Sequence, residues 1–236
     1  MSDLLAEQFD RLLSDLPTDE KAAQAAIEAS GFLDVLVAEA KGGAGLSLAE
    51  AFDLGFAAGR RLAPGAVTHT MLARALGCAN DALPKHVAAA ATALEMAGAM
   101  ANCVDITIEY AGMRRQFGRE ISKFQAIQHQ LAVMAEEAMA AKMAARLAFV
   151  GAAQDLTESR AAIAKIRAGE AAQIVAAGAH AVHGAIGISQ EHALHRYTKA
   201  LRARRIAHGG ESYWAEILGR ETLAAKGGVL EFVRAL

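Results

Sequence analysis

Apolar residues recur every three or four positions through much of the chain, which is the period of a helix that buries one face. The stripe is clearest within residues 123–153, at Ile127, Leu131, Met134, Ala138, Ala141 and Ala145. Further long helices are predicted over residues 84–116, 157–183, 190–206 and 212–225. Long helices with short connections favour an up-and-down helical bundle.

Shorter helices are predicted in the first third of the chain, where residues with capping chemistry precede apolar runs. Thr18 can cap one such helix. Ser47 and Glu50 have the spacing of a capping box, in which each side chain accepts a hydrogen bond from the other residue's amide. Ser122 and Gln125 repeat this spacing later in the chain.

The composition strengthens the prediction of an all-α fold, since 54% of residues are apolar but only 5% are aromatic. Much of the apolar share is alanine, the residue with the highest helix propensity. A net charge of −2 without a basic surface does not predict a nucleic-acid partner. Cys78 and Cys103 lack metal-site spacing and predict reduced, buried thiols in a cytoplasmic protein.

No membrane association is expected. The acidic N-terminus is unlike a signal peptide. Residues 87–104 are apolar, but they are rich in alanine and interrupted by Glu95 and Asn102. This pattern predicts the buried helix of a soluble protein and not a membrane span.

Two segments carry a resemblance to a known family. Residues 110–125 read YAGMRRQFGREISKFQ, and residues 181–210 read AVHGAIGISQEHALHRYTKALRARRIAHGG. Together they resemble the C-terminal helical domain of flavin-dependent acyl-CoA dehydrogenases, and the first part of the chain resembles the helical N-terminal domain more loosely. The resemblance implies two regions, a partial N-terminal helical region over 1–80 and a C-terminal bundle over 81–236.

The middle β-domain of that family has no counterpart in the sequence. Only the seven residues 77–83 separate the two regions, and seven residues form a loop. In the family this domain packs on the flavin ring and helps to hold the acyl-CoA. The resemblance therefore implies that a partner subunit supplies it.

Four residues are implied to bind cofactor. Arg114, Gln116 and Phe117 occupy the R-x-Q-F-G motif, whose residues in the family reach across a subunit interface to the flavin pyrophosphate and its surroundings. An arginine fork suits phosphate oxygens. Gly184 lies in the family's glycine turn, although Ala181 and Ala185 replace the usual glutamine and second glycine. Arg114 could instead pair with carbonyls at its helix end, and Gly184 could serve only as a helix stop.

The resemblance implies no catalytic residue in this chain. The family uses a glutamate base, and its two known locations correspond here to His208 and Ala88. Glu95 and Glu211 are nearby in sequence, but each would need to reach a substrate placed elsewhere. The paired histidines His180/His183 and His192/His195 lack the E-x-x-H pattern of bundle metal sites, so no metal is expected.

These observations predict the non-base-bearing subunit of a heteromeric FAD-dependent acyl-CoA dehydrogenase. FAD would be shared at a subunit interface, and a full-length acyl-CoA dehydrogenase subunit would supply the base and most of the acyl-CoA pocket. At least a dimer is expected. Two alternatives stay open: a structural bundle for oligomerisation that binds no flavin, and a self-sufficient flavoenzyme that uses His208.

Overall fold

The computed structural model describes residues 2–225 and 227–236. Its α-helices are α1 (Ser2–Ser14), α2 (Glu20–Ala29), α3 (Leu48–Arg61), α4 (Val67–Leu76), α5 (Lys85–Met113), α6 (Gln125–Ala148), α7 (Glu158–His183), α8 (Leu194–Ile206), α9 (Glu211–Ala224) and α10 (Gly228–Arg234). A small antiparallel hairpin joins β1 (Arg115–Gln116) to β2 (Arg119–Glu120), and short 3-10 turns, labelled η, occupy several connections. The all-α prediction is confirmed.

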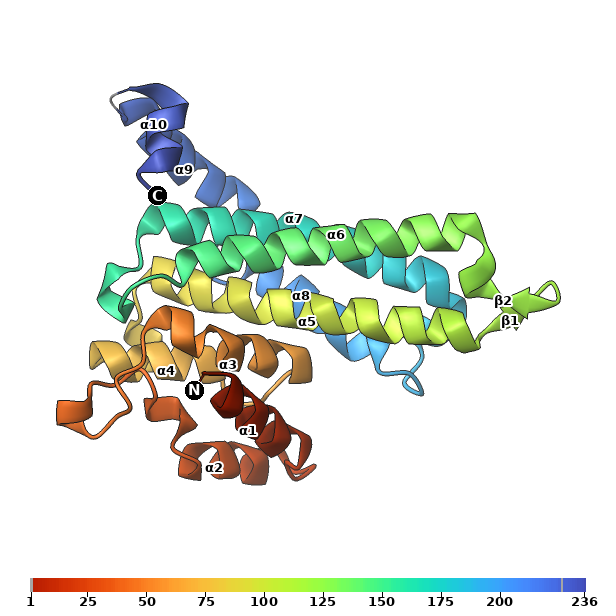
Figure 1. Ribbon diagram of the computed structural model, residues 1–236, viewed down its shortest axis with the longest axis horizontal. Coiled ribbons are helices and arrows are strands. Elements are labelled where there is room, and N and C mark those ends of the chain that lie inside the picture. Colours follow the sequence, from red (N-terminus) through yellow and green to blue (C-terminus); the bar gives the residue numbers. More distant parts are fainter. Residues whose placement is uncertain (1, 226) are drawn as a thin grey trace.

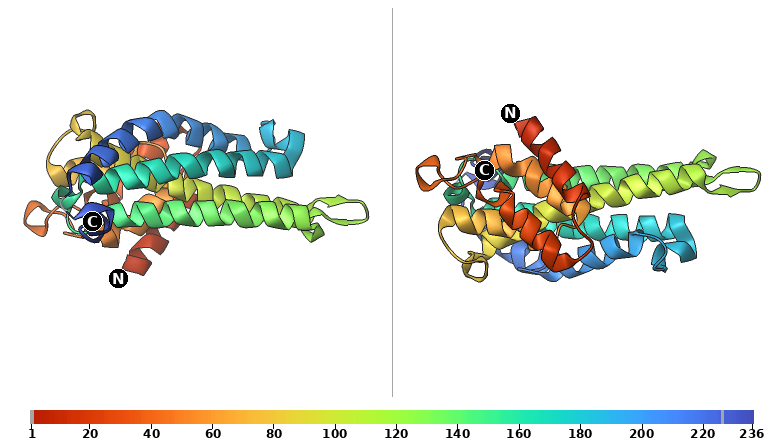
Figure 2. Two further views of the ribbon diagram at one scale, coloured as in Figure 1. Left: turned by 90° about the horizontal axis from the view of Figure 1, so that it is seen from above. Right: turned by 90° about the horizontal axis from the view of Figure 1, so that it is seen from below.

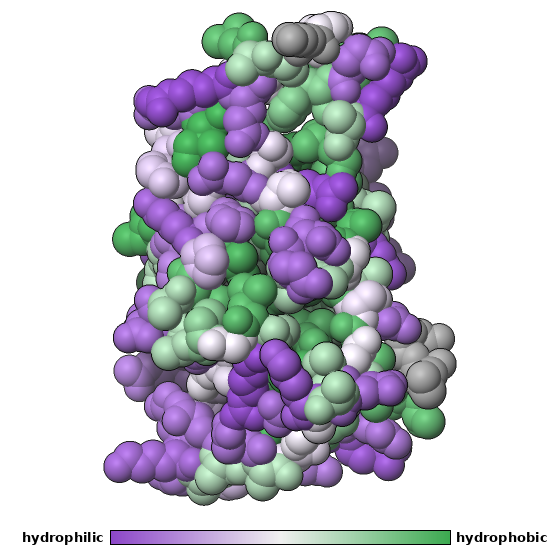
Figure 3. All heavy atoms as spheres, turned by 90° about the vertical axis from the view of Figure 1, so that its left-hand side faces the viewer, coloured by the Kyte–Doolittle hydropathy of each residue, from purple (hydrophilic) through white to green (hydrophobic). Residues whose placement is uncertain are grey.

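The long helices α5, α6 and α7 lie side by side along the molecule, and α8 runs beside α5 and α7 (Figures 1 and 2). The shorter helices α1–α4 cover one side of this bundle toward the end where α5 begins. The β1–β2 hairpin projects from the opposite end (Figure 1). The end face near the start of α5 carries many polar side chains, with apolar ones in the gaps between them (Figure 3). The hairpin is therefore the most isolated feature of the fold.

Alanine makes the bundle tight. The first half of α5 is buried almost all round, from Val87 to Met100, and half of its residues there are alanine. The crossing of α3 and α5 depends on two glycines: a Cβ on Gly98 would lie 2.1 Å from the Phe56 carbonyl oxygen, and one on Gly59 would lie 2.2 Å from the Glu95 carbonyl oxygen. Helices α3 and α5 thus meet almost backbone to backbone.

The N-terminal helices share the bundle's core. Leu48 and Phe52 of α3 and Leu72 of α4 belong to the same buried cluster as Leu94 and Met96 of α5. A second cluster lies beneath α1, α2 and α3, around Phe9, Ile27, Leu54 and Met71. The division of the chain at residue 80 stays a prediction.

The capping residues observed at helix ends agree only in part with those predicted from the sequence. The Ser47–Glu50 capping box is confirmed, with Ser47 N donating to Glu50 Oε2 at 2.9 Å and Glu50 N donating to Ser47 Oγ at 3.4 Å. The predicted Thr18 cap is wrong, because Asp19 caps α2 by accepting from Ala22 N at 2.8 Å.

The predicted box at Ser122 and Gln125 is also wrong. Residues 121–123 form a 3-10 turn, and Phe124 precedes α6 without a side-chain cap. Similarly, α5 ends at Met113 and not near residue 116, because Arg115 and Gln116 pair with Glu120 and Arg119 across the hairpin.

By length and composition, α5 and residues 158–188 could cross a membrane. In α5, however, 89% of the most apolar window is buried inside the bundle, as in the core helix of a soluble protein.

Candidate functional site

The β1–β2 hairpin turns through a strained residue. Phe117 has φ = 51° and Gly118 has φ = 81°, so both central residues of the two-residue turn are left-handed. Such turns favour Asn-Gly, and a bulky residue at the first position is strained. The Phe117 side chain is also 91% exposed. A strained, exposed aromatic residue makes the tip of this projecting hairpin a candidate for a functional contact.

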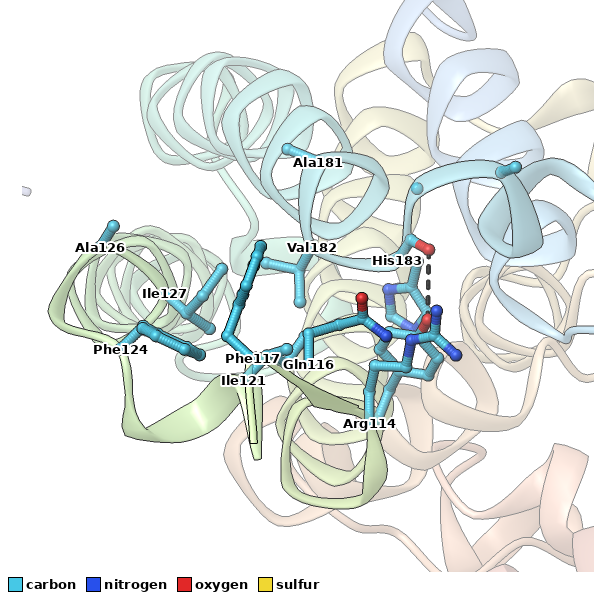
Figure 4. A pocket seen from close by; sticks show the side chains of 13 residues that line it. Arg114, Gln116, Phe117, Ile121, Phe124, Ala126, Ile127, Ala181, Val182 and His183 are labelled. Atoms are coloured by element: carbon cyan, nitrogen blue, oxygen red, sulfur yellow. Dashed lines mark hydrogen bonds between the residues drawn. The ribbon is translucent and has the colours of Figure 1, made fainter. Parts of the chain in front are cut away.

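A cavity of about 570 Å³ opens between this hairpin, the start of α6 and the end of α7 (Figure 4). Its walls are mainly apolar, with polar groups at one end. Its lining comprises Tyr110, Arg114, Gln116, Phe117, Ile121, Phe124, Ala126, Ile127, Ala181, Val182, His183, Gly184 and Ala185. All four residues predicted to bind cofactor line it, although they come from segments almost seventy residues apart.

Arg114 has its side chain exposed at the cavity. Within the described residues its guanidinium enters no hydrogen bond or ion pair, whereas the adjacent Arg115 lies 3.6 Å from Glu120. The arginine fork is therefore available to a ligand. Gln116 is not wholly free, because its Nε2 donates to the Arg115 carbonyl at 2.8 Å.

Gly184 ends α7 with φ = 64° and ψ = −142°, a conformation for which glycine is suited. An added Cβ would meet no atom within 4 Å, so this glycine is required by its backbone angles and not by crowding. The methyl groups of Ala181 and Ala185 face the same cavity. The polar contact that a glutamine would make at position 181 is absent.

Tyr110 and His183 form the inner wall, a role that the sequence did not indicate for either residue. Their rings stack with centroids 4.4 Å apart, and the Tyr110 hydroxyl donates to the His183 carbonyl at 3.4 Å (Figure 4). His183 Nδ1 donates to the Ala179 carbonyl at 2.8 Å, and burial lowers the pKa of the ring, which keeps it neutral. His192 packs edge-on against His183. These contacts fix the backbone just before Gly184.

The two positions that correspond to the base of the family, His208 and Ala88, lie away from this cavity. His208 has φ = 57°, and its ring lies 5.3 Å from that of His69. Burial and then His69, Lys165 and Lys85 lower its pKa. Ala88 is buried in the core. Neither position carries a carboxylate.

The two glutamates considered as substitutes are engaged. Glu95 lies 3.1 Å from Arg204, and Glu211 lies 2.5 Å from Arg205. Each therefore neutralises an arginine of α8.

Lys165 holds the His208 turn in place. Its side chain is 1% exposed, and its Nζ donates to the carbonyls of Arg205 at 2.6 Å and Gly209 at 2.9 Å. Burial lowers its pKa to about 8. A buried amine that closes the end of α8 has no freedom to reach a substrate.

A pH experiment checks this assignment of Lys165. Between about pH 8 and the pKa of 10.5 in the unfolded chain, the unfolded state holds a proton that the folded state has lost. Stability therefore rises with pH in this window. We expect the free energy of unfolding of the wild type to increase relative to Lys165→Met from pH 8 to 10.5, measured by urea titration. A constant difference would contradict the assignment.

The histidine pairs form no metal centre in the part of the chain that the structure describes, where no group of three His, Cys, Asp or Glu is suitably close. His180 Nε2 lies 3.0 Å from the Thr198 hydroxyl, and His195 Nδ1 lies 2.7 Å from the His192 carbonyl. The histidines are engaged in local hydrogen bonds.

Comparison with known proteins defines the class. Residues 68–223 match the family model described as acyl-CoA dehydrogenase, C-terminal domain. The chain belongs to the acyl-CoA dehydrogenase family.

Particular relatives are similar over part of their length. Acyl-CoA dehydrogenase IpdE2 of Mycobacterium tuberculosis is 39% identical over 112 residues, which cover 48% of this chain and 34% of IpdE2. Glutaryl-CoA dehydrogenase of Desulfococcus multivorans is 32% identical over 174 residues, covering 71% of this chain and 39% of the relative. The chain spans between about a third and two fifths of these curated relatives.

Two solved structures match nearly end to end. A chain of the ChsE4-ChsE5 complex from Mycobacterium tuberculosis superposes with a TM-score of 0.80 at 17% identity, covering 96% of this chain and 98% of that one. A chain of a Tcur3481-Tcur3483 steroid ACAD variant gives a TM-score of 0.77 at 20% identity, with coverages of 95% and 99%. At these identities the likeness shows a common fold.

Proposed function

We propose that this chain is the subunit without a catalytic base in a heteromeric FAD-dependent acyl-CoA dehydrogenase. The observation that carries the proposal is the meeting of Arg114, Gln116, Phe117 and Gly184 at one cavity beneath a projecting hairpin. An unpaired guanidinium beside apolar walls fits the pyrophosphate and adenosine parts of FAD. When bound, FAD accepts hydride from the β-carbon of an acyl-CoA thioester.

The residues of this chain would hold one end of that cofactor. Arg114 offers two parallel N–H donors to phosphate oxygens. Gly184 lets a ligand approach the backbone, because no side chain lies above it. Phe117 provides an exposed aromatic face at the tip of the hairpin, where it lines the cavity (Figure 4). Their roles are binding and orientation.

The proton transfer falls to the partner. Arg114 and Ala88 are 26 residues apart along α5 and the residue that follows it, which is about 39 Å at 1.5 Å per residue. The cavity and the base-equivalent turn thus lie near opposite ends of the bundle. A cavity that serves an interface, with the base and β-domain in a neighbouring subunit, accounts for both this separation and the missing carboxylate.

The fold neighbours support the same arrangement. Chains that match this one over at least 95% of both lengths come from structures described as the ChsE4-ChsE5 complex and as Tcur3481-Tcur3483, each naming two components. These neighbours support the proposal that a chain of this fold works in an assembly with a second, different subunit. By analogy, we assign this chain a full-length dehydrogenase subunit as partner.

The test is co-purification with full-length acyl-CoA dehydrogenase subunits encoded beside this gene, followed by visible spectroscopy. We expect flavin absorbance and acyl-CoA oxidation only in the complex. A colourless complex would leave the structural bundle as the function. Flavin and turnover in the isolated chain would favour an enzyme that uses His208.

A variant of the hairpin tip separates its turn geometry from its aromatic ring. Phe117→Asn places the favoured residue at a left-handed position. We expect the isolated chain to be as stable as the wild type, or more stable by up to about 1 kcal/mol, in thermal unfolding. The complex should nevertheless lose flavin. A destabilised isolated chain would mean that Phe117 supports its own fold.

A further inference from the structure

The carboxylate of Glu95 lies in an unusual environment. Five buried side-chain atoms of the described residues have no hydrogen-bond partner. Three of them, Thr68 Oγ1, His69 Nδ1 and Arg204 Nη1, belong to residues that each place an atom within 4 Å of this carboxylate. Glu95 is 4% exposed and Thr68 is 1% exposed. Unpaired buried polar atoms are costly, so three in one cluster require an explanation.

The contacts of Glu95 bring these three residues together. Oε2 lies 3.1 Å from Arg204 Nη2, and Oε1 accepts from Thr68 N at 3.3 Å. Oε1 also faces His69 Nδ1 at 3.9 Å, which is too long for a hydrogen bond. The site joins α4, α5 and α8, and it is independent of the flavin cavity at the other end of α5.

The tautomer of His69 follows from its neighbours. The Thr92 hydroxyl donates its single proton to the Ala88 carbonyl at 2.9 Å, so it accepts from His69 Nε2 at 3.2 Å. His69 Nε2 therefore carries the ring proton. Burial lowers the pKa of His69, which keeps the ring neutral and leaves a lone pair on Nδ1. Two acceptors, Nδ1 and Oε1, thus face each other without a proton between them.

We propose that Thr68, His69, Glu95 and Arg204 form a binding site for one buried water molecule. Arg204 Nη1 and the Thr68 hydroxyl are donors, while His69 Nδ1 and Glu95 Oε1 are acceptors. Water has two lone pairs and two protons, so it matches this set of two donors and two acceptors. Arg204 disfavours a cation and Glu95 disfavours an anion, so the site selects a small neutral molecule.

The bound water links the N-terminal helices to the bundle. Thr68 and His69 belong to α4, Glu95 to α5 and Arg204 to α8. Buried waters typically make about three hydrogen bonds and are costly to remove. The water therefore stabilises the contact between α4 and the end of α8, next to the turn that carries His208.

Thr68→Val tests the site, because it replaces a hydroxyl by a methyl group of similar size. If the hydroxyl bonds the water, the variant loses one buried hydrogen bond, and the unfolding equilibrium constant rises about five- to tenfold. If the hydroxyl has no partner, the same change removes an unsatisfied polar group and stabilises the chain. Thr107→Val, which loses a direct bond to the Cys103 carbonyl, gives the scale for one hydrogen bond.

A high-resolution crystal structure of the whole chain supplies the second measurement. We expect a density peak within hydrogen-bonding distance of at least three of the four atoms. A more stable Thr68→Val variant overturns the proposal. So does a structure without this peak, whatever the stability of the variant.

Discussion

Gly98→Ala should strongly destabilise the protein. The added methyl group would lie 2.1 Å from the Phe56 carbonyl oxygen and 2.8 Å from the Arg60 amide nitrogen, both backbone atoms of α3. Because neither can rotate away, α3 and α5 must separate. Overpacking of a tight core costs about 1–3 kcal/mol and more where backbone must move, against a total stability of about 5–15 kcal/mol. Denaturant titration followed by circular dichroism measures the loss.

The matched control lies on the same helix. An added methyl group at Gly112 would meet no atom within 4 Å, so Gly112→Ala gains helix propensity without a clash. We expect it to be neutral or stabilising by up to about 1 kcal/mol. Equal effects of the two substitutions would show that the α3–α5 contact does not depend on glycine.

The hydrophobic period was sufficient to predict the bundle. Its stripe on α6 is buried where expected at Met134, Ala138, Ala141 and Ala145. The hydrophobic period does not predict the α3–α5 contact, since nothing in the spacing of Gly59 or Gly98 distinguishes a glycine at a helix crossing from an exposed glycine. That distinction depends on which helix lies opposite, which only the folded chain determines.

The exact ends of the helices depend on competition between neighbouring residues or between alternative backbone pairings. Thr18 and Asp19 are both capping residues, and the choice between them depends on which one adopts extended backbone before α2. Likewise, Arg115 and Gln116 have no feature that excludes a helix. They leave α5 because Arg119 and Glu120 pair with them as a strand.

The residues proposed to bind cofactor could be predicted from the sequence, but the aromatic residues of the inner wall could not. The motif around Arg114 and the turn at Gly184 identified two segments, and the fold brings them to one cavity. The stacking of Tyr110 on His183 was not apparent from either segment alone. The sequence did place both residues next to predicted site residues, since His183 directly precedes Gly184 and Tyr110 lies one helical turn before Arg114. Interpreting it required knowing that α5 and α7 end side by side.

Arg114→Ala is expected to have the largest effect on the proposed complex. The substitution leaves a cofactor pyrophosphate without its charge-assisted donors, a loss of about 2–3 kcal/mol. The Kd for FAD should therefore rise about 30- to 150-fold. Titration of the deflavinated complex with FAD, followed by flavin fluorescence, measures this change. The isolated chain should keep its stability, because within the described residues the Arg114 side chain makes no hydrogen bond or ion pair.

The neighbouring arginine provides the control for charge. Arg115 is exposed and carries the same charge, but it lies beside Glu120 and does not line the cavity. Arg115→Ala should change FAD affinity less than about threefold, which is less than 1 kcal/mol for an exposed pair. Equal losses in both variants would indicate general attraction to a positive hairpin. A loss confined to Arg114→Ala requires a directed contact, because the two guanidinium groups differ in position and not in charge.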